Sequence, residues 1–384
     1  GANSVCVPAA CTTIADCPAG SHVCSSGTCI VPDATACLID EAGGTQAMVD
    51  LRDKLGRPIK DLRVSITDRC NFRCPYCMPK EVFGERYKFL SKPQILTFEE
   101  IARMVRIFVG LGVTKIRLTG GEPLVRQGLE DLVAMISEIN GIEDLTLTTN
   151  GYLLAQKAQL LKDAGLHRIT VSLDSLNDAI FRQMSGRNYG SDRVLAGIQK
   201  AKEVGFSPIK INAVVRRGVN DNTIIELARH FKGTNDIVRF IEYMDVGNLN
   251  GWRWDDVVPA EELRQRINQE TPIEPIGKNY PGEVAKRYRY MDGKGEIGII
   301  TSVSKPFCGD CTRARLSTDG KLYTCLFASV GTDLREPIRN DASDEEVRSI
   351  ITAIWGRRVD RYSEERAFRN EEPSQKIEMY QIGG

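Results

Sequence analysis

The sequence contains little histidine: His22, His167 and His230 are the three in a chain of 384 residues. Imidazole is the commonest general base in enzymes and the commonest metal ligand. The scarcity therefore argues against zinc catalysis or acid–base catalysis built on histidine. We assign these three residues no role, because isolated histidines are usually structural.

Long apolar runs and an excess of either charge are also lacking. No stretch approaches the roughly 18 apolar residues of a membrane-spanning helix, and no signal peptide is visible. Lysine plus arginine and aspartate plus glutamate both number 51, which argues against a general polyanion binder but leaves a local basic pocket open. We expect no membrane or nucleic-acid partner, and a location in the cytoplasm, or in the mitochondrial matrix if the source is eukaryotic.

Cysteine is absent between Cys77 and Cys308, although the chain holds twelve. Six lie in the first 37 residues, three at 70–77 and three at 308–325. Scattered structural cysteines would not cluster in this way. Because each of the two later groups has an odd number of members, internal disulfides alone cannot pair them.

The six N-terminal cysteines define a cysteine-rich appendage, residues 1–46. Six cysteines allow 15 disulfide pairings, and a small disulfide-stapled module is favoured over a metal site because no C-x2-C pair occurs there. Disulfides require an oxidising compartment, which conflicts with the expected cytoplasm, so a fusion or a gene-model artefact is the other interpretation. The cysteines concerned are Cys6, Cys11, Cys17, Cys24, Cys29 and Cys37.

Residues 47–254 alternate short β-rich runs with helical ones, which predicts an α/β fold with a parallel sheet. Six such units predict an incomplete (β/α)6 TIM-like barrel, with an open doubly wound sheet as the alternative. The expected strands are Leu62–Thr67, Lys115–Thr119, Asp144–Thr149, Arg168–Asp174, Lys210–Val215 and Ile237–Tyr243. The expected helices lie at 98–111, 128–139, 153–164, 192–204 and 221–232.

The regular alternation ends near Trp254. We expect residues 255–384 to form a smaller C-terminal region that covers the barrel opening and carries the last cysteine group. Its expected elements are a helix at Glu261–Asn268, strands at Ile297–Thr301 and Ala314–Ser317, and a charged helix near 343–358.

After the appendage comes Cys70-x3-Cys74-x2-Cys77, called the first cysteine group from here on, which directly follows the first expected strand. In β/α barrels the C-terminal ends of the strands carry the active site. A [4Fe–4S] cluster takes four thiolates, so three from one loop leave one iron open to another molecule. A zinc knuckle or unrelated free thiols are the alternatives.

The segment from Cys70 to Cys77, CNFRCPYC, resembles the motif of the radical S-adenosylmethionine superfamily. The resemblance implies that the open iron binds the amino and carboxylate groups of S-adenosylmethionine, which one electron then cleaves to methionine and a 5′-deoxyadenosyl radical. The segment Gly120-Gly121-Glu122-Pro123 resembles the superfamily's GGEP segment, which binds the methionine amino group. The implied cofactor contacts are Tyr76, Gly121, Ser172 and Met244.

The last cysteine group, Cys308-x2-Cys311-x13-Cys325, is again one ligand short of a closed zinc site. Together with CTRARL at 311–316 it resembles the GTP 3′,8-cyclase family, and the resemblance covers roughly residues 50–384. It implies a second [4Fe–4S] cluster whose open iron holds the guanine of GTP. It also implies hydrogen abstraction from ribose C3′ and attack on guanine C8, the first step of molybdenum cofactor biosynthesis.

GTP requires a concentration of cations, because a triphosphate carries about four negative charges. A cation within an apolar strand is costly unless it faces a polar lumen or is paired. Lys115 and Arg239 can also be edge or ion-pair residues. The resemblance implies as GTP contacts Arg63, Lys115, Arg117, Thr148, Lys210, Arg239, Arg313 and Arg315.

The chain ends in Gly383-Gly384. A frayed terminus and a ubiquitin-like sulfur carrier are two interpretations, and the second is disfavoured by the long preceding chain. The family resemblance implies the third, in which the tail reaches the active site. We therefore expect Cys70, Cys74, Cys77, Arg313, Arg315, Gly383 and Gly384 to be catalytic.

The resemblance also implies partners: an electron donor such as a flavodoxin or ferredoxin, hand-off to cyclic pyranopterin monophosphate synthase, and a homodimer. Two alternatives stay open. The first is another radical enzyme with an auxiliary cluster, such as a peptide-modifying maturase. The second is a non-catalytic module that binds nucleic acid through two zinc sites, against which the neutral charge and the odd ligand counts weigh.

Overall fold

The computed structural model describes residues 50–366 and 376–383, together with the backbone of four short strands upstream. These pair antiparallel, β1 (Val23–Ser25) with β2 (Thr28–Ile30) and β3 (Cys37–Ile39) with β4 (Thr45–Ala47). The side chains of the cysteine-rich head, and with them the predicted disulfides, lie outside the described residues, as does Gly384.

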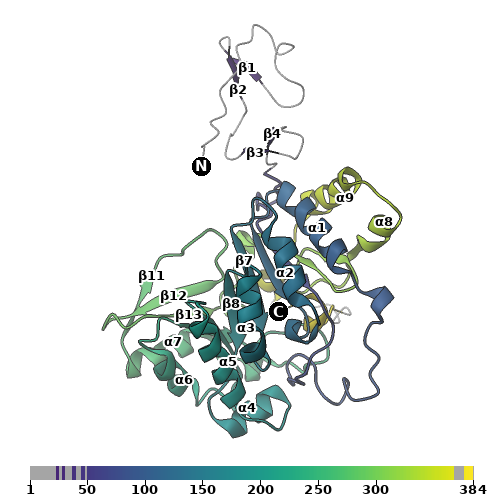
Figure 1. The fold of residues 1–384 in the computed structure, drawn as a ribbon. Coiled ribbons are helices and arrows are strands. Elements are labelled where there is room, and N and C mark those ends of the chain that lie inside the picture. The colour runs from purple at the N-terminus through teal and green to yellow at the C-terminus, as the bar shows by residue number, and fades with distance from the viewer. Residues whose placement is uncertain are drawn as a thin grey trace.

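One large sheet organises the described chain (Figure 1). Eight neighbouring strands run parallel in the order β13-β10-β9-β8-β7-β6-β5-β14. They are β5 (Asp61–Ser65), β6 (Lys115–Thr119), β7 (Asp144–Thr149), β8 (Arg168–Ser172), β9 (Lys210–Val215), β10 (Ile237–Glu242), β13 (Glu296–Ile300) and β14 (Arg313–Leu316). Antiparallel strands extend both ends: β12 (Ala285–Tyr290) and β11 (Ile273–Ile276) beside β13, β15 (Lys321–Tyr323) and β16 (Thr332–Asp333) beside β14.

The predicted α/β architecture is confirmed, and the helices follow the strands in the expected rhythm. Helices α1, α2 and α3 lie side by side along the sheet (Figure 1), and α1 also contacts α9. The main helices are α1 (Phe98–Gly110), α2 (Leu129–Ser137), α3 (Leu154–Asp163), α4 (Asp178–Ser185), α5 (Asp192–Glu203), α6 (Ile224–Phe231), α7 (Ala260–Glu270) and α9 (Asp344–Gly356). Three further α-helices are short: α8 (Arg335–Arg339), α10 (Tyr362–Glu365) and α11 (Met379–Ile382).

Helix α1 shows how the sequence specifies these elements. Thr97 caps it: its hydroxyl accepts from Glu100 N at 3.1 Å, and the Glu100 carboxylate accepts from Thr97 N at 2.7 Å. The apolar residues at helical spacing, among them Ile101 and Phe108, are fully buried in the main core. Burying each such side chain stabilises the fold by about 1.5–3 kcal/mol.

The strands alternate between an apolar face and a polar one. On β5, Leu62 and Val64 are buried in the core shared with the helices, while Arg63 lies on the opposite face. Fully buried parallel strands normally read as continuous apolar runs. The interrupted pattern instead reflects a polar interior side of the sheet, and that side holds the site.

The two C-terminal strands predicted near 297–301 and 314–317 form, but their places in the main sheet were not predicted. β13 pairs in parallel with β10, and β14 pairs in parallel with β5. The proposed boundary at 254/255 therefore divides the chain within one sheet. Helix α4 was also missed, because its eight residues are too few to display a helical period over several turns. None of the described helices is both long and apolar enough to cross a membrane.

Candidate active site

The first cysteine group lies in the loop that leaves the C-terminal end of β5, as predicted. Cys70, Cys74 and Cys77 are free and half-buried. Cys74 O accepts from Cys77 N at 3.0 Å and from Met78 N at 2.8 Å, which folds the CPYC segment into a tight turn. Burial, with the nearby charge of Glu122 as a second cause, raises the pKa of Cys70 to about 12. A bound metal centre would stabilise the thiolates that burial alone disfavours.

The glycine pair of the GGEP segment packs against that loop. Gly121 N donates to Thr67 O at 2.7 Å, and a Cβ on Gly121 would lie 2.3 Å from the carbonyl oxygen of Arg69. Gly120 has φ +144°, a conformation that side chains rarely allow. The glycines therefore fix the position of the cysteine loop, whatever else they bind.

The glutamate of the same segment is buried and fully partnered. Its carboxylate accepts from Thr149 Oγ1 and from Asn150 N, both at 2.6 Å, and from Leu124 N at 3.0 Å. Burial raises the pKa of Glu122 to about 7. Glu122 thus joins the GGEP turn to the end of β7 and fixes the position of the loop after β6 relative to the loop after β7.

The other predicted S-adenosylmethionine contacts come from different parts of the chain. The Tyr76 hydroxyl donates to Asp174 Oδ2 at 2.8 Å, and Asp174 lies two residues beyond the end of β8. Burial raises the pKa of Asp174 to about 6. Ser172 is half-buried at the last position of β8, and Met244, just beyond β10, lines the main cavity.

A cavity on the polar face joins most of the predicted GTP contacts to the last cysteine group. It encloses about 1140 Å³ when the solvent at its mouth is included. Lys210 and the first cysteine group do not line it. The predicted residues that do are Arg63, Lys115, Arg117, Thr148, Arg239, Met244, Cys308, Cys311, Arg313, Arg315 and Cys325.

Register explains the gathering of cations. β5 lies between β14 and β6, so that Arg315, Arg63 and Arg117 are Cα partners across three adjacent strands. Burial and the neighbouring charge of Arg315 lower the pKa of Arg63 well below its ordinary value. Within the described chain, Nε of Arg63 and Nε of Arg117 are buried without a hydrogen-bond partner. A row of desolvated guanidiniums with unused donors is a site for an anion. We call Arg63, Arg117 and Arg315 the cation row.

Further cations surround this row. Burial, then Arg239 and Arg168, lower the pKa of Lys210 to about 7, and burial with Arg117 lowers that of Arg239 to about 9. Arg239 Nε donates to Asn212 Oδ1 at 2.9 Å. Lys115 is paired with Asp144, with 3.3 Å between Nζ and Oδ2. Lys115 therefore forms an ion pair, as its alternative interpretation expected, and it also lines the cavity.

The last cysteine group forms one wall of the cavity. Burial alone would raise the pKa of Cys311, but the charges of Arg313 and Arg358 outweigh it and lower the pKa to about 7. Cys308, Cys311 and Cys325 are free. Among residues 50–366 and 376–383, no three His, Cys, Asp or Glu side chains converge tightly enough for a single metal ion. Thiolates that each bind a different iron of a cluster do not need such convergence.

The C-terminal tail contacts both the first cysteine loop and an arginine that lines the cavity. Tyr380 packs with Met78 and Phe83 in a small core against the first cysteine loop, and its hydroxyl lies 2.7 Å from that of Tyr87. Three residues later, Gly383 O accepts a hydrogen bond from Arg315 Nη1 in the cavity wall. Gly383 thus contacts a residue that lines the cavity, and its predicted catalytic role stays a prediction.

Some lining residues were missed by sequence reasoning. Asn212 was detectable, since it follows Lys210 by two positions on β9 and shares its face. Tyr280 gave no signal, because it lies in an irregular loop. Its hydroxyl accepts from Lys115 Nζ at 3.0 Å, and its ring lies 4.5 Å from the same nitrogen.

A cysteine loop at the C-terminal end of a parallel sheet, held by a Gly-Gly turn beside a cation-lined cavity, defines a radical S-adenosylmethionine protein. Residues 64–231 match the model of the Radical SAM superfamily. The crystal structure of Streptococcus suis SuiB shares the fold, with a TM-score of 0.53 at 16% identity over 79% of this chain and 67% of that one.

Within that class, the chain belongs to the GTP 3′,8-cyclase family. It is 56% identical over 321 residues to the GTP 3′,8-cyclase of Acidothermus cellulolyticus, covering 83% of this chain and 89% of the relative. The enzyme of that name from Staphylococcus epidermidis (strain RP62A) is 51% identical over 337 residues, 87% of this chain and 99% of the relative. Residues 236–364 match the model Molybdenum Cofactor Synthesis C.

Proposed function

We propose that this chain cyclises GTP to (8S)-3′,8-cyclo-7,8-dihydroguanosine 5′-triphosphate, using S-adenosylmethionine and a reductant, as the first step of molybdenum cofactor biosynthesis. The observation that carries the proposal is one cavity lined both by buried guanidiniums with unused donors and by Cys308, Cys311 and Cys325. Family membership supports the same reaction.

The cation row offers a place for the triphosphate. Arg63 and Arg117 have buried donors to spare, and charge-assisted hydrogen bonds to phosphate are among the strongest in proteins. Thr148 is already oriented by Arg117 Nη1 at 2.9 Å. Lys115, Lys210 and Arg239 would add positive charge around the phosphates, as predicted from the sequence.

The guanine end would then point at the last cysteine group. Three cysteines in the cavity wall suit a second [4Fe–4S] cluster with one open iron. Arg313 and Arg315 line the same cavity as these cysteines, and Arg315 belongs to the cation row as well. Two polar anchors at opposite ends of GTP would hold its ribose at a fixed position between them.

The first cysteine group suits the other cluster. S-adenosylmethionine bound there would supply, on one-electron reduction, the radical that removes hydrogen from C3′ of the ribose. Tyr76, Gly121, Ser172 and Met244 are proposed to hold this cofactor. The chain's own contribution is to align the two molecules and to exclude water.

The tail is proposed to complete the site. Gly383 O accepts from Arg315, and Tyr380 packs by the first cysteine loop, so the tail reaches from that loop to an arginine of the cavity wall. Gly383 and Gly384 would act beside the reacting ribose, with Arg315 as their anchor.

Finer features of the assembly are also part of the proposal. The parallel strands would curve into an incomplete (β/α)6 TIM-like barrel (47–254) whose opening is covered by 255–384, with 1–46 as an appendage. We further propose a homodimer in the cytoplasm, an electron donor such as a flavodoxin or ferredoxin, and hand-off to cyclic pyranopterin monophosphate synthase.

Anaerobic reconstitution followed by turnover tests the function. The protein should bind about eight irons, four for each [4Fe–4S] cluster, and should form 5′-deoxyadenosine and the cyclic triphosphate when given dithionite, S-adenosylmethionine and GTP. Colourless protein holding only zinc would refute the proposal. Formation of 5′-deoxyadenosine with a peptide but not with GTP would favour the maturase alternative.

A further inference from the structure

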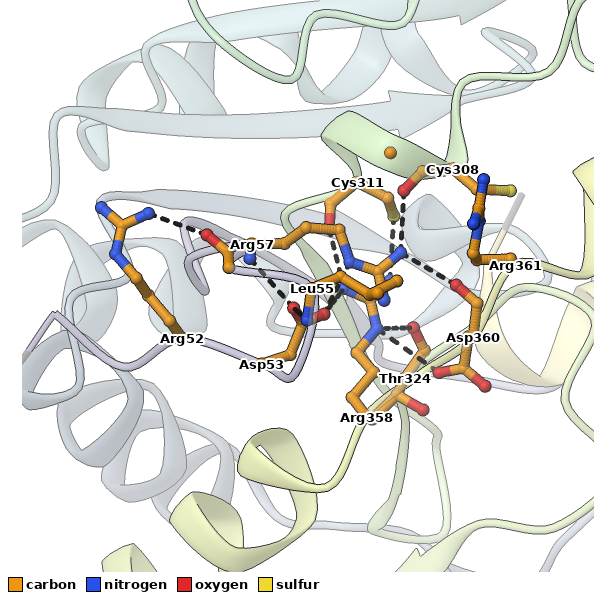
Figure 2. A network of polar contacts seen from close by, with 12 residues as sticks. Arg52, Asp53, Leu55, Arg57, Cys308, Cys311, Thr324, Arg358, Asp360 and Arg361 are labelled. Carbon is orange, nitrogen blue, oxygen red and sulfur yellow. Dashed lines mark hydrogen bonds and ion pairs between the residues drawn. The ribbon is translucent and has the colours of Figure 1, made fainter.

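A buried network of charged residues lies behind the last cysteine group (Figure 2). Asp53 accepts from Arg57 Nε at 2.6 Å and from Arg358 Nη1 at 3.2 Å, both on Oδ2. The three side chains are 0%, 2% and 1% exposed, respectively. None of them lines the cavity that we assign to GTP, so substrate binding does not account for them.

The two arginines reach the cysteine segments directly (Figure 2). Arg57 Nη1 donates to Cys308 O at 2.7 Å. Arg358 Nη1 donates to Cys311 O at 2.7 Å, and its Nη2 lies 3.2 Å from Cys311 Sγ. These are contacts to the backbone and to the sulfur of proposed cluster ligands.

Arg358 also joins two separate segments of the chain. Cys308 and Cys311 precede β14, whereas Cys325 follows β15. Arg358 Nε donates to Thr324 O at 3.1 Å, one residue before Cys325. One planar guanidinium therefore sets the distance between the Cys311 segment and the Cys325 segment.

The orientation of Arg358 is fixed from several sides. Asp53 binds its Nη1, and Trp355 lies under the guanidinium, 4.5 Å from ring centre to Cζ. Trp355 Nε1 in turn donates to Arg57 O at 3.1 Å. Buried ion pairs are weak sources of stability, because desolvation offsets their attraction. Their value here lies in the geometry that they impose.

We propose that Arg358, oriented by Asp53 and assisted by Arg57, is a positioning residue for the last cysteine group. It sets the spacing of Cys311 and Cys325 before a cluster is assembled, and it donates a hydrogen bond to a ligand sulfur afterwards. The inference rests on the proposed function, in which these cysteines hold the second cluster.

The hydrogen bond to sulfur has a measurable consequence. Hydrogen bonds to the sulfurs and the local charge set the reduction potential of an iron–sulfur cluster. A cationic donor favours the added electron, so its removal should make the potential of the second cluster more negative. A residue that only stabilised the fold would not shift this potential.

The test uses full-length protein in which the first cysteine group is replaced (C70A, C74A and C77A), so that all bound iron reports on the second site. In this background about four irons should bind. R358K keeps the positive charge but loses the planar guanidinium with its several donors, and R358Q loses both the charge and the guanidinium. We expect each to lose at least half of the iron, and the cluster that remains to show a more negative midpoint potential, more so in R358Q.

Arg339 provides a matched control. Its Nε donates to Glu100 Oε1 at 2.7 Å and its Nη2 to Ile95 O at 3.0 Å, so it too joins a carboxylate to a backbone carbonyl. Neither of these partners belongs to a cysteine segment. R339K should keep the full iron content, the same electron paramagnetic resonance signal and the same potential.

Full iron with unchanged signal and potential in R358Q would overturn the proposal. If R358Q does not fold by circular dichroism, D53N and R57K decide in its place, and retained iron in both would equally overturn it. These readouts are independent of turnover. Failure of the unaltered protein to convert GTP would refute the proposed function, whereas the iron content would still decide whether the network positions the cysteines.

Discussion

Lys210 does not line the cavity, but its charge is finely balanced by burial and by the cations around it. Burial and the cations around it lower its pKa to about 7, so the free protein holds it partly neutral. A nearby triphosphate would favour the ammonium form and raise that pKa again. GTP binding should therefore take up a proton, and affinity should fall as the pH rises above about 7.

Calorimetry at pH 7.5 in buffers of different ionisation enthalpy measures that uptake, which we expect to be roughly half a proton or more. K210M should abolish it. K157M is the control, since Lys157 pairs with Glu130 on the surface at 3.2 Å. Equal proton uptake by K210M and the unaltered protein would contradict the prediction.

The same residue affects folding with the opposite pH trend. Its pKa is about 7 when folded and about 10.4 when unfolded, so the folded state binds fewer protons between these values. Lys210 therefore destabilises the ligand-free protein fully below pH 7 and progressively less as the pH rises. K210M should raise the free energy of unfolding most at the acidic end, which denaturant titration from pH 6 to 9 would show.

At the scale of elements, the turn after β6 controls the cysteine loop. G121A would place a methyl group 2.3 Å from Arg69 O, so the loop must move, at a cost of about 1–3 kcal/mol. We expect iron at the first site to fall by more than half while the second site stays loaded.

Iron analysis of G121A in a background without Cys308, Cys311 and Cys325 measures the first site alone. G277A is the control, because a Cβ there meets nothing within 4 Å. Full iron in G121A would show that the loop tolerates the displacement.

The tail is the second element with a sharp steric requirement. Gly383 has φ +68°, and a Cβ there would lie 2.0 Å from Thr119 Cγ2. G383A should expel the tail and lower kcat at least tenfold. It should also lower Tm, because Tyr380 and Ile382 of the tail are buried.

Gly218 separates the steric effect from backbone strain. It has φ +72° with nothing within 4 Å of an added Cβ, so G218A carries the same strain in open space. If G383A cleaves S-adenosylmethionine but forms no cyclic product, the displaced tail is the cause of the lost cyclisation. Normal turnover by G383A would show that the tail contact is dispensable.

For the whole molecule, the cation row makes the free protein less stable than its fold allows. Anions that fill it should raise Tm in the order triphosphate, diphosphate, monophosphate. A ligand concentration of 100 times Kd raises the free energy of unfolding by about 2.7 kcal/mol. Thermal shift with GTP, GDP and GMP checks the order, and an equal response to all three would refute a triphosphate site.

Much of this molecule could be predicted from the sequence because local patterns specify it. The six central strands and α1 follow from periodicity, and the cysteine loops follow from spacing. The places of β13 and β14 could not be predicted, since pairing between β14 and β5 depends on tertiary contacts that no local run records. The Asp53–Arg358 contact was invisible for the same reason: charged residues in loops normally indicate a solvated surface.

The neighbourhood of β5 has a consequence for biosynthesis. Its partner on one side, β6, is made soon afterwards, but its partner on the other, β14, pairs Arg313 with Asp61 across most of the chain. On the ribosome, one edge of β5 must wait for nearly the whole polypeptide, and an unpaired edge invites association with other chains. Chaperone demand and loss to aggregates should therefore concentrate in the interval before β14 emerges.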